Sequence, residues 1–358
     1  MPDYQFVDHP DDISENISGH AQLGVDTEFM REKTYFAQLC LIQVSTRDDI
    51  YCVDPLVEAG QAEFWGQLLA SSWVVHSARQ DIEVVYQTAG SMPRKIFDTQ
   101  IAAGLLGMPA QMGYAGLVKE LFDVDVDKSH TRADWTRRPL ADAVLEYAAE
   151  DVEYLLPAAD LLSERLEQKN RLDWARQDSL MLLDTALYDV SGDQAIDRLK
   201  GARNFRGRKR AAAVRLAAWR EKEAIRRDRP RQWIVRDSVL LDIAYNLPSS
   251  EKQLAEIEDM PPKLVSRVGQ QLIKVVLATK NHESGYTPPQ PPDEAQKALL
   301  KEMQSQVAAC AKELDIAAET VASKRELSAV IISGSRDSRV FQGWRRDLIG
   351  KDLLDLLS

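Results

Sequence analysis

The segment VDTEF, residues 25–29, decides the class of fold. Asp26 and Glu28 stand two residues apart among apolar neighbours, as on a buried β-strand, and the two-residue repeat of a strand places both carboxylates on one face. Two carboxylates forced together repel each other, which costs free energy unless a cation lies between them. The segment therefore predicts an interior strand that carries a cation-binding site.

Further strands are expected along the first half of the chain. The runs QLCLIQVS (38–45) and IYCVD (50–54) are apolar or β-branched, and the polar turn TRDD between them favours antiparallel hairpins. Two more short strands are expected at 73–76 and 96–98, each followed by a helix. Hairpins followed by strand–helix units predict a mixed α/β sheet with helices on its faces.

Two more carboxylates extend the pattern. Asp81 begins the helix that follows strand 73–76, in VVHSARQDIE. Tyr147 and Asp151 stand four apart, hence on one face, in the longest helical pattern, residues 140–169, where Pro157 is expected to kink the helix. Together with Asp26 and Glu28, these acids can hold two Mg²⁺ or Mn²⁺ ions. Two such ions can activate a water for displacement at phosphorus, and Tyr147 would orient that water or help to deprotonate it.

Each of these motifs also has a simpler explanation. A D-x-E pair fits a solvated strand edge, a Y-x-x-x-D pair fits an exposed helix face, and Asp81 fits an acid favoured by the helix dipole. The three motifs in this order favour the metal site, because chance rarely supplies all of them.

The second half of the chain is expected to be entirely helical. Helices are expected at 208–227, 236–280 and 293–358, and the proline-rich stretch SGYTPPQPPDE lies between the last two. The domains predicted from these breaks are 1–195, 196–288 and 289–358.

Charge is distributed unevenly in this acidic chain, whose net charge is −11. Residues 198–236 hold 15 Lys or Arg against three acids, a local balance of +12, which favours contact with phosphates. Trp219 and Trp233 of this segment are expected in a helical core. The residues expected to contact nucleic acid are Lys128, Arg132, Arg137, Arg206, Arg208, Lys209 and Arg210.

A resemblance to a known superfamily rests on four segments: VDTEF, VVHSARQDIEVVY, IFDTQIAAGLLG and EYAAEDVEYLLPA. Together they resemble the DEDD 3′→5′ exonucleases, in the subclass with tyrosine in the third motif. The segment DKSHTRADWTRRPL resembles the ribonuclease D family within it. The resemblance covers about residues 5–165. It implies a ribonuclease H-like sheet, and an activity that releases nucleoside 5′-monophosphates from a free 3′ end.

The resemblance also implies a role for each matched residue. Asp26, Glu28 and Asp151 would hold the metal ion on the side of the nucleophile, and Asp26 would also bind the second ion. Asp81 would support the site partly through water, and Tyr147 would position the nucleophile.

The helical half carries a second resemblance. Residues 205–280 are similar to the HRDC domain, a helical nucleic-acid-binding accessory, and the last segment resembles a second, more divergent copy. The implied substrate is RNA with a free 3′ end, with tRNA precursors as the expected class. A DNA-directed exonuclease of the same superfamily and a non-catalytic nucleic-acid-binding protein are the alternatives. A helicase is excluded, because the chain has no GxxxxGK[ST] phosphate loop.

Several other classes of protein do not fit. The chain has no run of eighteen apolar residues and no secretory signal at its start, and its three cysteines have no CxxC spacing. We therefore expect a cytoplasmic protein without a membrane span. Our further expectations are a monomer and no nucleotide cofactor.

Overall fold

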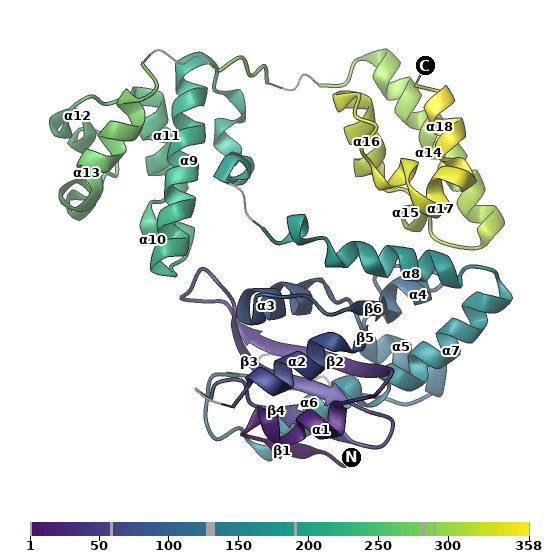
Figure 1. Cartoon of the computed structure of the whole chain (residues 1–358). Helices are drawn as coiled ribbons and strands as arrows, with labels where there is room; N and C mark the ends of the chain where they lie inside the picture. The colour runs from purple at the N-terminus through teal and green to yellow at the C-terminus, as the bar shows by residue number, and fades with distance from the viewer. Residues whose placement is uncertain are drawn as a thin grey trace. The chain divides into compact units, whose positions relative to one another are not determined.

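The computed structural model describes residues 2–57, 60–126, 133–189, 192–280, 284–288 and 291–357 (Figure 1). The chain divides into two compact units, each held together by its own internal contacts. Unit 1 comprises Met1–Met30, Gln38–Asp184 and Pro291–Ser358, and unit 2 comprises Arg31–Ala37 and Thr185–Gln290. Among the described helices, none has the length and apolar character needed to span a bilayer.

Unit 1 contains a six-stranded mixed sheet with the order β1-β4-β3-β2-β5-β6. Its strands are β1 (Gln5–Val7), β2 (Gln22–Met30), β3 (Gln38–Ser45), β4 (Ile50–Val53), β5 (Ser72–Val75) and β6 (Lys95–Asp98). The pairs β2–β3 and β3–β4 are antiparallel, which confirms the predicted hairpins. The pairs β2–β5, β5–β6 and β1–β4 are parallel. The edge strand β1 was not predicted.

The helices around the sheet lie between or after its strands. They are α1 (Ser14–Ile17), α2 (Ala62–Ala70), α3 (Arg79–Ala89), α4 (Thr99–Leu105), α5 (Tyr114–Phe122), α6 (Asp142–Glu153), α7 (Leu155–Gln168) and α8 (Leu172–Leu180). Asp98 caps α4, because its carboxylate accepts hydrogen bonds from the backbone N–H groups of Gln100 and Ile101. The expected mixed sheet with flanking helices is confirmed.

The predicted helix 140–169 is two helices, α6 and α7, which meet at Tyr154. The expected kink at Pro157 is therefore a break three residues earlier. A proline ring collides with the carbonyl four residues before it and offers no N–H to that carbonyl. For Pro157 that carbonyl belongs to Glu153, which is the last residue of α6.

The C-terminal helices of the chain belong to unit 1. They are α14 (Glu294–Leu314), α15 (Ala318–Val321), α16 (Lys324–Ser333), α17 (Gly343–Arg345) and α18 (Lys351–Asp355), with their own apolar core. This C-terminal module packs against α8, where the ring of Trp344 stacks on Trp174 with centroids 4.5 Å apart. The buried Arg345 guanidinium donates to both carboxylate oxygens of Asp178, at 2.6 and 2.7 Å.

Unit 2 is helical around a separate apolar core. Its helices are α9 (Gly207–Arg227), α10 (Arg231–Ile234), α11 (Asp237–Asn246), α12 (Glu251–Ala255) and α13 (Pro262–Leu277). Residues 236–280, which were expected to be helical, form three helices, α11 to α13. Ser250 caps α12 by accepting a hydrogen bond from the N–H of Gln253, as its position ahead of EKQLAEI suggests.

The segment Arg31–Ala37, which follows β2 in the chain, is part of unit 2. The Tyr35 hydroxyl donates to Glu221 at 2.5 Å, and the Asp228 carboxylate accepts from the backbone N–H groups of Tyr35 and Phe36. Glu221 is buried and also accepts from Arg231. The strand that carries Asp26 and Glu28 therefore continues directly into a segment held by the helical unit.

Candidate active site

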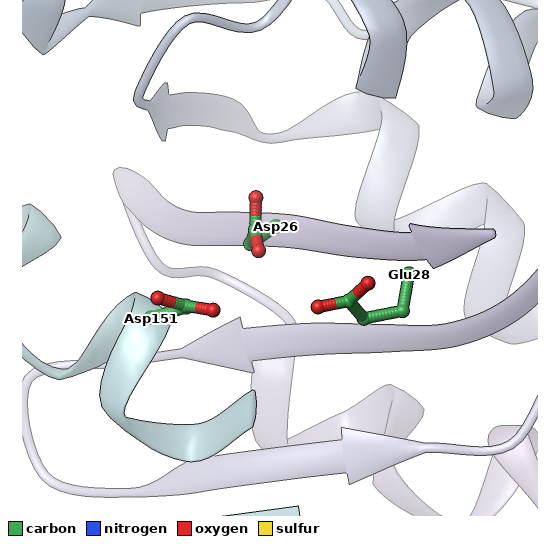
Figure 2. Close-up of side chains that lie close together, drawn as sticks. All are labelled: Asp26, Glu28 and Asp151. Carbon is green, nitrogen blue, oxygen red and sulfur yellow. The ribbon is translucent and has the colours of Figure 1, made fainter. Parts of the chain in front are cut away.

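Three carboxylates come together where β2 meets α6. One carboxylate oxygen from each of Asp26, Glu28 and Asp151 lies within 4.8 Å of the other two. Figure 2 shows Asp26 and Glu28 on the strand and Asp151 on the helix beside it. Only oxygen ligands are offered, which is the donor set that Mg²⁺ and Mn²⁺ prefer.

Close packing between strand and helix produces this arrangement. Gly24 lies on the same face of β2 as Asp26, and a Cβ atom there would lie 2.2 Å from Ser45 Oγ and 3.2 Å from Leu155 Cβ. The Ser45 hydroxyl in turn donates to the carbonyl of Val152, one residue after Asp151. A glycine is required at position 24, because any side chain would push α7 away from the strand.

The fourth predicted carboxylate, Asp81, lies near the cluster but is not part of the set within 4.8 Å. It lies in the first turn of α3 and is buried, and its Oδ1 accepts a hydrogen bond of 2.6 Å from the Thr27 hydroxyl. Thr27 stands between Asp26 and Glu28 in the chain, so its side chain points to the other face of the strand. The middle residue of the D-x-E motif thus fixes Asp81, a role that the sequence did not reveal.

Two tyrosines support Asp151. The Tyr147 side chain, buried one turn earlier on α6, hydrogen-bonds Asp151 and lowers the pKa of that carboxyl against the effect of burial. The hydroxyl of Tyr114 donates to the carbonyl of Glu150 and accepts from the N–H of Tyr154, both at 3.0 Å. Tyr114 therefore bridges the break between α6 and α7 beside Asp151. Sequence reasoning missed it, because only the fold brings the residue to this place.

Burial and mutual repulsion disturb the acidity of all four carboxyl groups. Burial, followed by the charges of Asp81, Asp151 and Glu28, raises the pKa of Asp26 well above its usual range. Burial and neighbouring carboxylates raise the pKa of Glu28 to about 8. Burial raises the pKa of Asp81 and of Asp151 to about 7. The metal-free site therefore holds protons that a divalent cation would replace.

These pKa values predict how the metal-free protein responds to pH. Each group binds its proton more tightly in the folded chain than in the unfolded chain, so stability falls as pH rises from about 4 to about 8. In the presence of a chelator, we expect Tm to decrease across this window. Asp151→Asn, which carries no charge at any pH, should make the decrease smaller. Thermal unfolding of both proteins measures the difference, and equal slopes would contradict the assignment.

Gln43 is a buried polar side chain that shares a strand face with these acids. It lies directly opposite Asp26 in the β2–β3 pair, so both side chains share one face. Gln43 is fully buried, and neither its amide oxygen nor its amide nitrogen has a hydrogen-bond partner among the described residues. A buried unpaired amide is costly and commonly marks a place for a water or an ion. Gln43 therefore fits a site in which a bound cation and its waters would supply the missing partners of the amide.

The residues expected to contact nucleic acid lie in different surroundings. Lys128 and Arg132 fall outside the described residues, and Arg137 and Arg206 are exposed. Arg208 donates weakly to Thr279, and Lys209 lies over the ring of Tyr245 at 3.3 Å. Arg210 is buried, donates to the Ala202 carbonyl and lies over Tyr286, so its guanidinium is used within the fold.

The tryptophans of the basic segment differ from each other. Trp219 is partly buried against the core of unit 2 and donates to Gln271, as expected for a core residue. Trp233 is 57% exposed, so the prediction that it lies in the core is wrong. The reason is that α10 is only four residues long and turns this side chain outward while Ile234 enters the core.

Known families match both halves of the chain. A family model described as 3′-5′ exonuclease matches residues 4–167, and the HRDC domain model matches residues 209–276. The exonuclease match contains all four carboxylates and Tyr147. The HRDC match contains α9 to α13 almost completely.

Individual relatives match nearly the whole chain. Ribonuclease D of Gluconacetobacter diazotrophicus is 35% identical, covering 99% of this chain and 93% of that protein. Ribonuclease D of Xanthomonas oryzae pv. oryzae is 34% identical, covering 98% of each. The crystal structure of Escherichia coli RNase D, described as an exoribonuclease involved in structured RNA processing, matches with a TM-score of 0.90 at 26% identity over 99% of each chain. The chain therefore belongs to the ribonuclease D family and is a 3′→5′ exoribonuclease with a metal-dependent type of active site.

Proposed function

We propose that Asp26, Glu28, Asp81 and Asp151 hold two divalent metal ions, Mg²⁺ or Mn²⁺, and that the chain removes nucleoside 5′-monophosphates one at a time from RNA with a free 3′ end. The observation that carries this proposal is the gathering of three partly buried carboxylates within 4.8 Å. When bound, the two ions would activate a water and stabilise the leaving oxygen of an in-line displacement at phosphorus.

The residues of the chain divide this work. Asp26, Glu28 and Asp151 hold the ion beside the nucleophile, Asp26 also binds the second ion, and Asp81, held by Thr27, supports the site partly through water. Tyr147 positions the attacking water through its hydroxyl, which already lies against Asp151. Because the pKa of a tyrosine is near 10, positioning is a more suitable role for it than proton removal.

The substrate that fits best is an RNA with a single-stranded 3′ end, and we propose trimming of tRNA precursors as its use. Arg137, Arg206 and Lys209 are exposed or partly exposed cations that suit phosphate contacts. We further propose that the protein acts as a monomer in the cytoplasm. All three cysteines are free thiols, which suits a reducing compartment.

A comparison of RNA and DNA tests the function. We expect a 5′-labelled RNA to shorten stepwise in Mg²⁺ or Mn²⁺ and to release nucleoside 5′-monophosphates, whereas the matching DNA is cut much more slowly. An RNA blocked at its 3′ end should persist. Degradation of the blocked RNA would contradict the exonuclease direction, and equal rates on both polymers would favour the DNA-directed alternative.

Gln43 gives a prediction about the surroundings of the metal site. Gln43→Leu keeps the volume but removes the amide, and we expect it to weaken Mn²⁺ binding by about 10- to 100-fold, because groups behind metal ligands have effects of this size. The metal-free Tm should stay the same or rise, since no unpaired polar group remains. Gln38→Leu, at an exposed position of the same strand, is the control. Unchanged Mn²⁺ affinity in Gln43→Leu would show that the amide has no part in the site.

A further inference from the structure

The exposed Trp233 lies beside a groove in unit 2. The groove has a volume of about 730 Å³ and is formed by residues 232–236, Val239, and residues of α13 and its N-cap. Buried apolar side chains form its floor, including Ile234, Val239 and Leu264. We call it the Trp233 groove. Its volume is in the range of sites that take ligands of nucleotide size.

The rim of the Trp233 groove is positively charged. Arg236, Lys263 and Arg267 line it and are exposed, and none of its lining residues, all within the described chain, is an acid. Arg229 adds a fourth positive charge, with its guanidinium carbon 6.0 Å from the centre of the Trp233 ring. An aromatic ring beside a groove whose charged lining residues are all positive fits an anionic partner that also has flat apolar faces.

These cations differ from five other arginines of unit 2. Five of its arginines are bound to acidic side chains: Arg198, Arg220, Arg226, Arg227 and Arg231. In contrast, Arg236, Lys263 and Arg267 have no ion-pair partner among the residues that the structure describes. These five guanidinium groups are therefore held within the fold, while the charge at the groove remains available to phosphates.

We propose that the Trp233 groove binds a single-stranded segment of the RNA substrate, with one base stacked on Trp233 and neighbouring phosphates held by Arg236, Lys263 and Arg267. The proposal rests on the chain acting on RNA. Every base offers a flat face to an aromatic ring, so this site tolerates any sequence and does not distinguish RNA from DNA. It supplies affinity for unpaired strands, while the choice of sugar is made elsewhere.

Stacking is tested with the full chain in a chelator, so that RNA is bound but not cut. A fluorescent single-stranded oligouridylate serves as the probe, and its Kd is measured by anisotropy. Loss of one base–aromatic stack corresponds to a Kd about 5- to 100-fold higher for Trp233→Ala, whereas Trp233→Phe should retain most of the affinity. Circular dichroism and Tm establish that each variant is folded.

The charges are tested separately. Lys263→Glu with Arg267→Glu should raise Kd and reduce the slope of log Kd against log salt by about 1.4, because two phosphate contacts are lost. The control pair is Lys301→Glu with Lys312→Glu, which makes the same charge change at exposed positions of α14. We expect the control pair to leave Kd within about twofold of wild type.

A cross-link locates the RNA directly. An oligouridylate containing 4-thiouridine, irradiated with the wild-type chain, should be attached to the peptide that contains Trp233. Folded Trp233→Ala and Lys263→Glu/Arg267→Glu variants with wild-type affinity would overturn the proposal. Tighter binding of polyglutamate than of RNA at the groove would also overturn it, since the occupant would then be an acidic protein. Whether the wild-type chain cleaves RNA in Mg²⁺ tests the proposed function, and this result does not depend on the binding measurements.

Discussion

Asp151→Asn is expected to lower the rate of RNA cleavage by at least about 10³-fold while RNA binding is retained. The substitution replaces a charged oxygen ligand by a neutral amide in the three-carboxylate cluster, and it also changes the partner of Tyr147. Charge stabilisation by bound metal contributes several kcal/mol to such reactions, and each 1.36 kcal/mol corresponds to about a factor of ten in rate. Single-turnover cleavage of a 5′-labelled RNA measures the effect.

The matched control is Asp142→Asn, which makes the same chemical change at an exposed position in the first turn of α6. We expect it to cleave RNA at nearly the wild-type rate. A folded Asp151→Asn variant with close to full activity would show that the three carboxylates do not hold the catalytic metal.

Asp178→Ala is expected to destabilise unit 1 by about 3–5 kcal/mol, because it leaves the Arg345 guanidinium buried without its carboxylate. Asp178 also accepts a hydrogen bond from the Trp344 indole, so the contact between α8 and the C-terminal module loses two interactions together. Chemical denaturation followed by circular dichroism measures the loss, and limited proteolysis measures release of the C-terminal helices.

Asp173→Ala is the control for this prediction. Asp173 is on the same helix and pairs with Arg176, but both side chains are largely exposed. Exposed pairs contribute less than about 1 kcal/mol, so we expect little change in stability. If Asp178→Ala were as stable as this control, the C-terminal module would not be held to α8 by the buried ion pair.

The sheet followed closely from sequence, and its omissions have physical causes. Five strands were predicted because each is a short segment in which apolar residues follow one another or alternate with polar ones. The edge strand β1 has only three residues, of which two are exposed, so it carries no periodic pattern. The helix ends before the proline, because Pro157 has no N–H to donate to the carbonyl of Glu153. Glu153 is therefore the last residue of α6.

Contacts distant in sequence were beyond prediction. The stacking of Trp344 on Trp174 joins residues far apart in the chain, and no local pattern indicates it. The same holds for Tyr35, which is attached to the helical unit by Glu221. The domain division at 195 and 288 stays a prediction, while the packing of the last helices against α8 shows that they are not structurally independent of the catalytic sheet.

The carboxylates of the candidate site were predicted from the sequence, but the residues that surround them were not. Asp26, Glu28 and Asp151 gather as their one-face spacing predicted. Thr27, Gln43 and Tyr114 were missed, because register and helix packing, which are not evident from spacing, bring them to the site. The charge count of residues 198–236 could not show which of its cations are held in ion pairs, as Arg198 and Arg231 are with the buried Glu221.

The most direct test of the account is the number of Mn²⁺ ions that the chain binds in the presence of a nucleoside 5′-monophosphate. Electron paramagnetic resonance or calorimetric titration can count them at neutral pH. The proposed arrangement of Asp26, Glu28, Asp81 and Asp151 predicts two ions per wild-type chain and the loss of at least one in Asp151→Asn. Equal stoichiometry and affinity in the two proteins would contradict the assignment of these carboxylates to the metal site.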